Sequence, residues 1–155
     1  MEDYYHLIYP MRTILISSKS GAKESVMAAD WCMPLSFDPP MFGVAIGKKR
    51  FTYELVKESK AYAINLVSPE MKGKMLTCGT KSGRTIDKFR EAGLKREDGK
   101  ITVLVGDSPA SIECKVVDEV GAGDHVLFVG EVVNAVIRKK DRGIYHFGDM
   151  RFAEL

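Results

Sequence analysis

The sequence predicts a mainly β domain, a β-barrel decorated with a few short helices. At least six extended segments are recognisable along the 155 residues, and turn signals separate them. The helical patterns between these segments are short, and no internal repeat, low-complexity tract or linker interrupts the chain. Many short strands with regular turns are typical of antiparallel barrels. The length fits a single domain over residues 1–155, which is ample for one hydrophobic core.

Each predicted strand is a run of apolar or alternating residues bounded by turn residues. In the predicted strand Ser111–Val117, apolar residues alternate with Glu113 and Lys115, which predicts that one side of the strand faces solvent. The predicted strand His125–Ile137 is almost continuously apolar, which predicts that it is covered on both faces, by the barrel interior on one side and by a helix or a second subunit on the other. The predicted strands are Arg12–Ser18, Ser25–Trp31, Met41–Gly47, Ala61–Val67, Ser111–Val117, His125–Ile137 and Ile144–Gly148.

Short helices are expected where capping residues precede amphipathic runs. Asp3 is a candidate cap for the first helix, which Pro10 would end, and Thr52 is a candidate N-cap for the second. Gly93 stands where a helix C-cap is expected at the end of the last. The predicted helices are Tyr4–Tyr9, Tyr53–Ser59, Pro69–Leu76 and Thr85–Leu94.

Composition excludes several classes of function. The net charge is +2, from 23 basic and 21 acidic residues, so no global field attracts nucleic acid or an anionic membrane. No apolar run approaches the roughly 20 residues of a membrane-spanning helix. The three cysteines are far apart and form no C-x-x-C motif, so neither a disulfide framework nor a metal site is predicted. We therefore expect a cytoplasmic protein with free thiols and no metal.

Two basic stretches stand next to predicted helix starts, where backbone N–H groups favour an anion. Lys48, Arg50 and Thr52 form the first, and the loop that carries Ser82 and Arg84 forms the second. The alternative for each is a solvated basic turn. The second stretch lacks the G-x-x-x-x-G-K-[ST] spacing of a P-loop, so nucleoside triphosphate hydrolysis is not expected.

The segment SVMAADWCMPLSFDPPMFGVAIGKKRFT carries a family resemblance, which AYAINLVS, SGRTIDKFREAGL and ECKVVDEVGAGDHVLFVGEVVNA extend. From roughly Arg12 to Phe147 the chain resembles the flavin reductase-like, FMN-binding split-barrel family, most of all its flavoredoxin-type branch. The resemblance implies a Greek-key split β-barrel with short capping helices. It also implies a homodimer with the flavin near the interface, FMN (FAD possible) as cofactor and NAD(P)H as a transient co-substrate.

The resemblance also implies roles for individual residues. His125 would face the second substrate, although the Gly-Asp before it is also a plain turn. Trp31 is expected in the core, Asn65 is alternatively a satisfied strand amide, and Cys32 is alternatively a buried, inert thiol. The cofactor-binding residues implied are Met27, Ala28, Ala29, Asp30, Trp31, Cys32, Ile46, Gly47, Lys48, Arg50, Thr52, Asn65, Ser82, Arg84 and Lys88.

One departure from the family pattern moves the expected phosphate site. The common form N-x-M-T-A-S-W has Ser25, Ala28 and Asp30 at its polar positions in this chain. Alanine donates no side-chain hydrogen bond and Asp30 would repel a phosphate, so Arg50 and Arg84 are expected to hold it, and alanine at either should weaken FMN binding. Asp30 is expected to point toward the ribityl hydroxyls or away from the ligand.

The function that follows is an FMN-binding oxidoreductase that passes electrons from NAD(P)H to flavin or to an acceptor, as in flavin reductases, flavoredoxins and ferric reductases. The acceptor would be a small molecule or a protein. The alternative is an electron-transfer or storage module with no NAD(P)H activity.

Overall fold

The computed structural model describes residues 3–155; Met1 and Glu2, which belong to the predicted domain, lie outside the described residues. The strands are β1 Met11–Ser20, β2 Lys23–Ala29, β3 Cys32–Phe37, β4 Pro40–Gly47, β5 Ala61–Leu66, β6 Arg96–Asp98, β7 Val103–Val105, β8 Ala110–Ala122, β9 His125–Ile137, β10 Ile144–Gly148 and β11 Arg151–Glu154. The helices are η1 Tyr4–Ile8, α1 Phe51–Ser59, η2 Pro69–Met71, α2 Lys72–Thr80 and α3 Lys88–Glu91, with η marking 3₁₀ turns. The mainly β prediction is confirmed.

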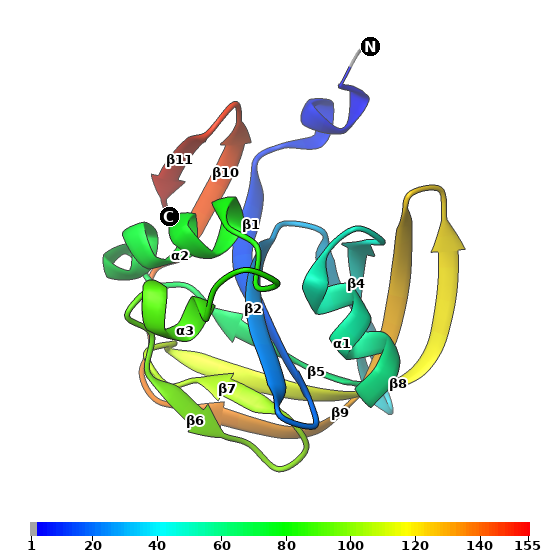
Figure 1. The fold of residues 1–155 in the computed structure, drawn as a ribbon. Coiled ribbons are helices and arrows are strands. Elements are labelled where there is room, and N and C mark those ends of the chain that lie inside the picture. Colours follow the sequence, from blue (N-terminus) through cyan, green and yellow to red (C-terminus); the bar gives the residue numbers. More distant parts are fainter. Residues whose placement is uncertain (1–2) are drawn as a thin grey trace.

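Nine strands form one curved sheet in the order β11-β10-β1-β5-β8-β9-β4-β3, with β2 joined to β1 beside this path. Figure 1 shows the long strands β8 and β9 wrapping under β1 and β2, while α2 and α3 lie on one side and α1 on the other. All the pairings within this sheet are antiparallel. The arrangement is the expected Greek-key split barrel with short capping helices.

The strand β1 changes its partner along one edge, and this change shapes the site described below. Met11 to Thr13 pair with β10, whereas Ile14 to Ser20 pair with β2. The other edge of β1 is taken by β5. Because β2 pairs with β1 alone among the described strands, its second edge has backbone N–H and C=O groups that no strand satisfies.

Two apolar cores lie on the two faces of the β1–β2 hairpin. Ile16, Met27 and Phe128 belong to the core inside the barrel. Leu15, Val26 and Met75 belong to a second core between the hairpin and the helices α2 and α3. Since successive side chains of a strand point to opposite faces, a strand with a core on each side is buried throughout. Six consecutive residues of β1 are accordingly buried.

The helix boundaries differ from the prediction. Arg50, not Thr52, is the N-cap of α1, and Thr52 lies buried in the first turn. A helix was predicted over Thr85–Leu94, but the structure has only the four-residue α3, which the Asp87 carboxylate caps. The helix α2 extends to Thr80, and an irregular loop occupies the residues between α2 and α3. Gly93, at φ +65°, does end α3 as predicted. Asp3 makes no side-chain cap for η1.

One strand prediction also needs correction. Glu113 on β8 is fully buried and does not face solvent, since N–H groups from the β6–β7 turn surround its carboxylate. In the single chain described, one face of β9 lies against the barrel core, whereas Val133 and Ile137 on its second half are 41% and 78% exposed. Cover of this second face by a second subunit stays a prediction. The strands β3, β6, β7 and β11 were not predicted. Among the described residues no helix is long and apolar enough to cross a membrane.

Candidate functional site

A groove of about 390 Å³ runs beside the end of β2 and the ends of β4 and β9. Small side chains form its walls, among them Ala28, Ala29 and Ala45, and Gly47 contributes no side chain. A ligand in this groove can therefore approach the backbone closely. The size falls within the range of about 300–1,000 Å³ that is usual for small-molecule sites. The lining residues are Tyr5, Tyr9, Met27, Ala28, Ala29, Asp30, Trp31, Ala45, Gly47, Arg50, Asp124 and His125.

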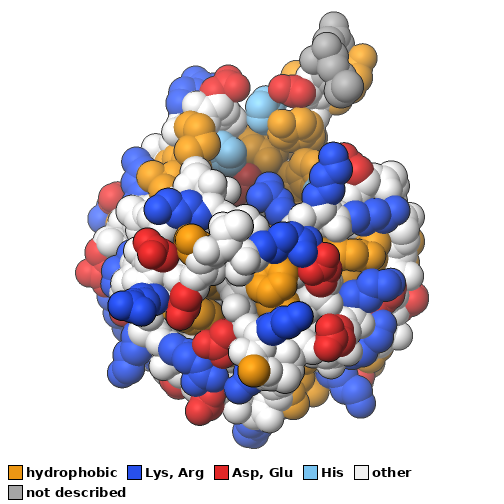
Figure 2. Space-filling model, in the orientation of Figure 1, with side chains coloured by type: hydrophobic (Ala, Val, Ile, Leu, Met, Phe, Trp, Pro, Cys, Tyr) orange, Lys and Arg blue, Asp and Glu red, His pale blue; other side chains and the backbone are white. Residues whose placement is uncertain are grey.

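A smaller cationic pocket of about 110 Å³ adjoins this groove and shares Met27 and Arg50 with it. It lies at the N-terminus of α1, where Arg50 makes no side-chain cap and the positive end of the helix dipole favours an anion. Four cationic side chains and no carboxylate are found among its lining residues. The residues that line the pocket are Met27, Lys49, Arg50, Phe51, Thr52, Lys81, Ser82, Gly83 and Lys88. Figure 2 shows Lys and Arg side chains across the middle of the face of the molecule that it draws.

Gly83 explains how the α2–α3 loop reaches the start of α1. A Cβ on Gly83 would collide with Ser25 Oγ and would lie 2.9 Å from Phe51 Cδ2. Only a residue without a side chain lets the loop pack this closely on β2 and α1. This packing brings Lys81 and Ser82 to the pocket.

Lys88 is the buried cation of the pocket. Its side chain is 6% exposed and Nζ donates to the Cys78 carbonyl oxygen at 2.8 Å. Burial, with a smaller contribution from the nearby Arg50, lowers the pKa of Lys88 to about 8. Desolvation disfavours an ammonium that has no counter-charge, so an anion in this pocket would restore the charged form.

Two of the predicted phosphate ligands lie elsewhere. The Arg84 guanidinium donates to both oxygens of Glu54 at 2.8 and 2.7 Å and lies 5.5 Å above the Phe51 ring. It therefore lines a neighbouring open groove and not the cationic pocket. Lys48 is exposed and lines neither the groove nor the pocket, and Lys49 takes its place.

Aromatic side chains close the other end of the groove. The Trp31 and His125 rings lie 4.7 Å apart, and Tyr5 meets Trp31 edge-on at 5.5 Å. Trp31 is half-buried and lines the groove, so the prediction of a core tryptophan is wrong. Its Nε1 donates to the Tyr9 hydroxyl at 3.2 Å.

His125 faces the groove with a fixed tautomer. Its Nδ1 lies 2.6 Å from Asp124 Oδ1, and because a carboxylate only accepts, Nδ1 carries the proton. The hydrogen bond from His125 lowers the pKa of Asp124. Nε2 lies beside Gly47, 3.7 Å from the position a Cβ would take there. Nε2 is thus the nitrogen that a bound molecule would meet.

Asp30 is held away from the cationic pocket, as expected of a group that would repel phosphate. Its carboxylate accepts hydrogen bonds from Thr13 Oγ1 at 2.6 Å, His146 Nδ1 at 2.7 Å and the Tyr9 hydroxyl at 3.1 Å. Burial, with Asp30 close by, raises the pKa of Tyr9 to about 12, so this hydroxyl stays protonated as a donor.

Three more predicted cofactor ligands have other roles. The Asn65 amide is fully buried and bonds Leu15, Ser17, Val105 and Ser111, so it is the satisfied strand asparagine and does not face the groove. Ile46 is fully buried in the barrel core. Cys32 packs against the same core, and burial raises the pKa of its thiol to about 12, which leaves an inert thiol.

Eight residues of the groove and pocket were missed in the sequence, namely Tyr5, Tyr9, Ala45, Lys49, Phe51, Lys81, Gly83 and Asp124. Lys49 and Lys81 belong to the two basic stretches, so the sequence indicated an anion site there. It did not indicate which of the neighbouring cations would line the pocket. No local signal marked Tyr5 and Tyr9, because their place depends on the turn of η1 over the end of the barrel.

Comparison with known proteins identifies the family of this chain. The family model of the flavin reductase like domain matches residues 5–154. An uncharacterized protein of Pyrococcus abyssi is 42% identical over 131 residues, which is 83% of this chain and 75% of that protein. A ferric-chelate reductase (NAD(P)H) of Archaeoglobus fulgidus is 27% identical over 140 residues, 90% of this chain and 82% of that one.

Solved structures show the same fold. The FMN-binding protein from Thermus thermophilus, solved with bound 1-cyclohex-2-enone, superposes with a TM-score of 0.90 at 25% identity, covering 99% of this chain and 91% of that one. The flavoredoxin from Methanosarcina acetivorans superposes with a TM-score of 0.88 at 25% identity, covering 96% and 86%. The resemblance seen in the sequence is confirmed, and the chain belongs to the flavin reductase-like family.

Proposed function

We propose that this protein binds FMN non-covalently in the groove and is an oxidoreductase that passes electrons from NAD(P)H to the flavin or to an acceptor. The observation that carries the proposal is the continuity of the groove with the cationic pocket through Met27 and Arg50. One end is suited to a phosphate and the other to a flat ring between small residues and an aromatic wall. The ferric-chelate reductase and the FMN-binding protein among its relatives support the same reading.

The residues present fit FMN. Lys49, Arg50, Lys81 and Lys88 supply cations that no carboxylate in the pocket neutralises, and the start of α1 supplies N–H groups. The unpaired edge of β2 offers backbone groups along the length of the ligand. When bound, the flavin supplies the two-electron redox chemistry, while the protein supplies binding, orientation and electrostatics.

His125 is the side chain we assign to the second substrate. Its ring lies against Trp31, and its Nε2 opens on the groove beside Gly47. With Nδ1–H held by Asp124, Nε2 accepts a hydrogen bond when the ring is neutral and donates one when it is protonated. His125 can thus orient a polar group of a nicotinamide, or of an acceptor, that lies over the flavin ring.

The absorbance spectrum of the purified protein tests the proposal. We expect a yellow protein with a band near ~450 nm that NADH or NADPH bleaches without oxygen. Trp31 is the single tryptophan of the chain and lines the groove, so FMN added to flavin-free protein should quench its fluorescence with a stoichiometry of about one per chain. A colourless protein with unchanged fluorescence would contradict the whole assignment.

A flavin-binding electron-transfer or storage module is the second candidate. Tyr5 stands edge-on to Trp31 at the end of the groove and narrows the approach of a nicotinamide. A yellow protein that neither NADH nor NADPH bleaches, but that a chemical reductant does, would favour this candidate over the reductase.

The buried Lys88 predicts a pH-dependent affinity. Its pKa of about 8 means that the ammonium loses its proton as the pH rises through 8, and the attraction for phosphate falls with it. FMN should therefore bind more weakly at pH 9 than at pH 7, as titrated by Trp31 fluorescence. Lys88→Met should bind more weakly at pH 7 and lose this pH dependence. An equally steep decline in Lys88→Met would show that another group is responsible.

A homodimer is part of the same proposal. Phe37 on β3 is fully exposed, and Val120 on β8 and Val133 on β9 are 46% and 41% exposed. Exposed large apolar side chains such as these are candidate contacts for a second copy of the chain. Light scattering in solution should give twice the chain mass of 17.2 kDa, and a monomer would contradict the homodimer. The cytoplasmic location and the lack of nucleic-acid and membrane partners stay predictions of the sequence.

A further inference from the structure

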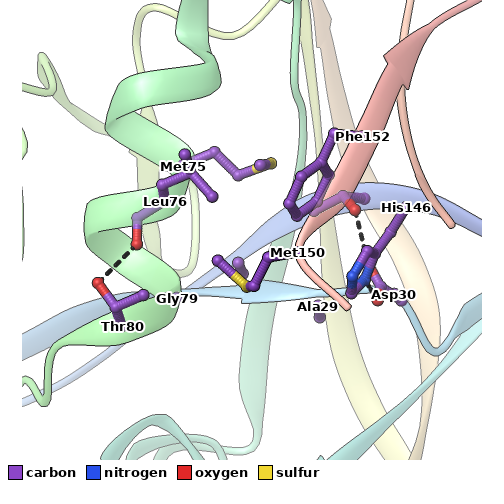
Figure 3. A pocket seen from close by; sticks show the side chains of 11 residues that line it. Ala29, Asp30, Met75, Leu76, Gly79, Thr80, His146, Met150 and Phe152 are labelled. Carbon is purple, nitrogen blue, oxygen red and sulfur yellow. Dashed lines mark hydrogen bonds and ion pairs between the residues drawn. The ribbon is translucent and has the colours of Figure 1, made fainter. Parts of the chain in front are cut away.

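The carboxylate of Asp30, the first residue after β2, is fixed by segments that are far apart in the sequence. It stands where β10 leaves β1 after Thr13 and where β2 joins the same edge from Ile14 onward. Its Oδ1 accepts from Thr13 Oγ1 at 2.6 Å, and its Oδ2 accepts from His146 Nδ1 at 2.7 Å. Figure 3 shows Asp30 beside the His146 ring, which stacks on Phe152 at 4.5 Å and 12°. Both β1 and β10 therefore hold Asp30 in place.

The Tyr9 hydroxyl connects this carboxylate to the aromatic end of the groove. It donates to Asp30 Oδ2 at 3.1 Å and accepts from Trp31 Nε1 at 3.2 Å. The Tyr9 ring has aromatic neighbours of its own, since it meets His6 and His146 edge-on at 5.3 Å each. Tyr9 thus passes the fixed position of Asp30 on to the side chain of Trp31.

The hydrogen bond to Tyr9 is what selects one orientation of the Trp31 ring. An indole has a single N–H donor and no acceptor, so Tyr9 takes all of its hydrogen-bonding capacity. The backbone of Trp31 is fixed by the amide of Ala45, which donates to the Trp31 carbonyl oxygen at 2.9 Å. A fixed backbone still leaves the two side-chain torsions several staggered positions. The half-buried ring borders a groove of about 390 Å³, which has room for it to turn.

The Trp31 ring in turn limits where the His125 ring can lie. The two rings are 4.7 Å apart and inclined at 39°. Among the described residues the His125 side chain has a hydrogen bond to Asp124 alone, and that carboxylate is 95% exposed. Asp124 therefore sets the tautomer, whereas Trp31 supplies the packed surface that keeps His125 in place beside Gly47.

We propose that Tyr9 is a positioning residue for the second substrate, because its hydroxyl holds the Trp31 ring and the Trp31 ring holds His125 at the groove. The inference rests on the proposed function, in which His125 orients the nicotinamide or the acceptor. Tyr9 acts through Trp31 and supplies no group to the chemistry. Its removal should therefore weaken the binding of the second substrate more than it slows the transfer of electrons.

Tyr9→Phe keeps the ring and removes the hydroxyl. At saturating FMN, we expect KM for the nicotinamide nucleotide to rise by about three- to tenfold, as for one lost hydrogen bond, and kcat to change less than KM. Steady-state oxidation of NADH or NADPH, whichever the wild type uses with the lower KM, measures both constants. Tyr4→Phe is the matched control, because Tyr4 is 69% exposed on the same turn and lines neither the groove nor the pocket. Its KM should stay within about twofold of the wild type.

A second measurement reads the position of Trp31 without flavin or substrate. Trp31 is the single tryptophan, so its indole N–H gives one resonance in the ¹⁵N-labelled, flavin-free protein. We expect this proton to exchange with solvent about three- to tenfold faster in Tyr9→Phe than in the wild type, and at the wild-type rate in Tyr4→Phe. Equal exchange in Tyr9→Phe and the wild type would overturn the proposal without any assay of activity.

A double-mutant cycle separates positioning from general support of the fold. Trp31→Phe removes the N–H that Tyr9 accepts, so adding Tyr9→Phe to it should raise KM no further. A rise of the same size in both backgrounds would show that Tyr9 does not act through Trp31 and would overturn the proposal, as would an unchanged KM in Tyr9→Phe. A wild type that oxidises neither nucleotide is a different result, which would contradict the reductase itself and the positioning role with it.

Discussion

Replacing Arg50 by alanine is expected to weaken FMN binding by about 10- to 100-fold. Arg50 lines both the groove and the cationic pocket at the start of α1. A hydrogen bond to a charged group contributes about 1.5–3 kcal/mol, and each 1.4 kcal/mol is a factor of ten in affinity. Titration of flavin-free protein with FMN, followed through Trp31 fluorescence, measures the change.

Arg84→Ala is the matched control for this experiment. Both arginines were expected to hold the phosphate, but the Arg84 guanidinium is paired with both oxygens of Glu54 and lies outside the pocket. Its removal breaks an exposed ion pair, which is worth little. We therefore expect FMN affinity to change by less than about twofold. The assignment of the phosphate to the cationic pocket would be wrong if Arg84→Ala weakened FMN binding as much as Arg50→Ala.

Replacing Glu113 by alanine should lower the free energy of unfolding by about 3–5 kcal/mol. The fully buried carboxylate accepts backbone hydrogen bonds from Lys100 and Ile101 at 2.9 Å and from Thr102 at 3.0 Å. Asn134 Nδ2 donates to it from β9 at 2.7 Å. Alanine would leave these donors without an acceptor in the interior. Urea unfolding of the two proteins at pH 7 measures the loss.

Lowering the pH should reduce the difference in the free energy of unfolding between the wild type and Glu113→Ala. Burial by itself would raise the pKa of Glu113, but the N–H groups of Ile101, Lys100 and Thr102 and the Asn134 amide outweigh it, and the net pKa is lowered. A lowered pKa means that the contribution is complete above the unfolded value of about 4.3 and is lost as the pH falls through the folded value. The gap between wild type and Glu113→Ala should therefore narrow below about pH 4.

Glu119→Ala on the same strand is the control, because Glu119 makes exposed ion pairs with Lys57 and Lys60. We expect it to cost at most about 1 kcal/mol. A loss in Glu113→Ala no larger than that in Glu119→Ala would show that the β6–β7 turn finds other partners for its N–H groups.

The fold was predictable to a large extent because it depends on patterns that are local. Apolar runs between turn residues located most of the strands, and the order of the motifs identified the family. Helix lengths were less accessible. Thr85–Leu94 was predicted as one helix, but only Lys88–Glu91 is helical, and the loop before it follows an irregular course in which Gly83 packs against Ser25 and Phe51.

The candidate site, like the fold, was predictable from the sequence only in part. The basic stretches and the histidine after Gly-Asp were visible in the sequence, and the structure brings Arg50, Ser82, Lys88 and His125 to the groove and its pocket. Whether a polar residue serves the ligand or the core was not visible. Asn65 was predicted as either a cofactor ligand or a satisfied strand amide, and Glu113 was predicted to face solvent. Each is in fact satisfied by backbone groups distant in sequence.

Short motifs and their spacing were enough to predict the fold class, the family and the two basic loops that we propose hold the anionic end of a ligand. The tertiary structure alone decided which cations converge, since Lys49, Lys81 and Lys88 meet only when the loop docks on α1. It alone also joined Asp30 to His146, 116 positions apart, and placed the Tyr9 hydroxyl between Asp30 and Trp31. The physical reason is that burial and hydrogen-bond pairing are settled between segments distant along the chain, where no local pattern records them.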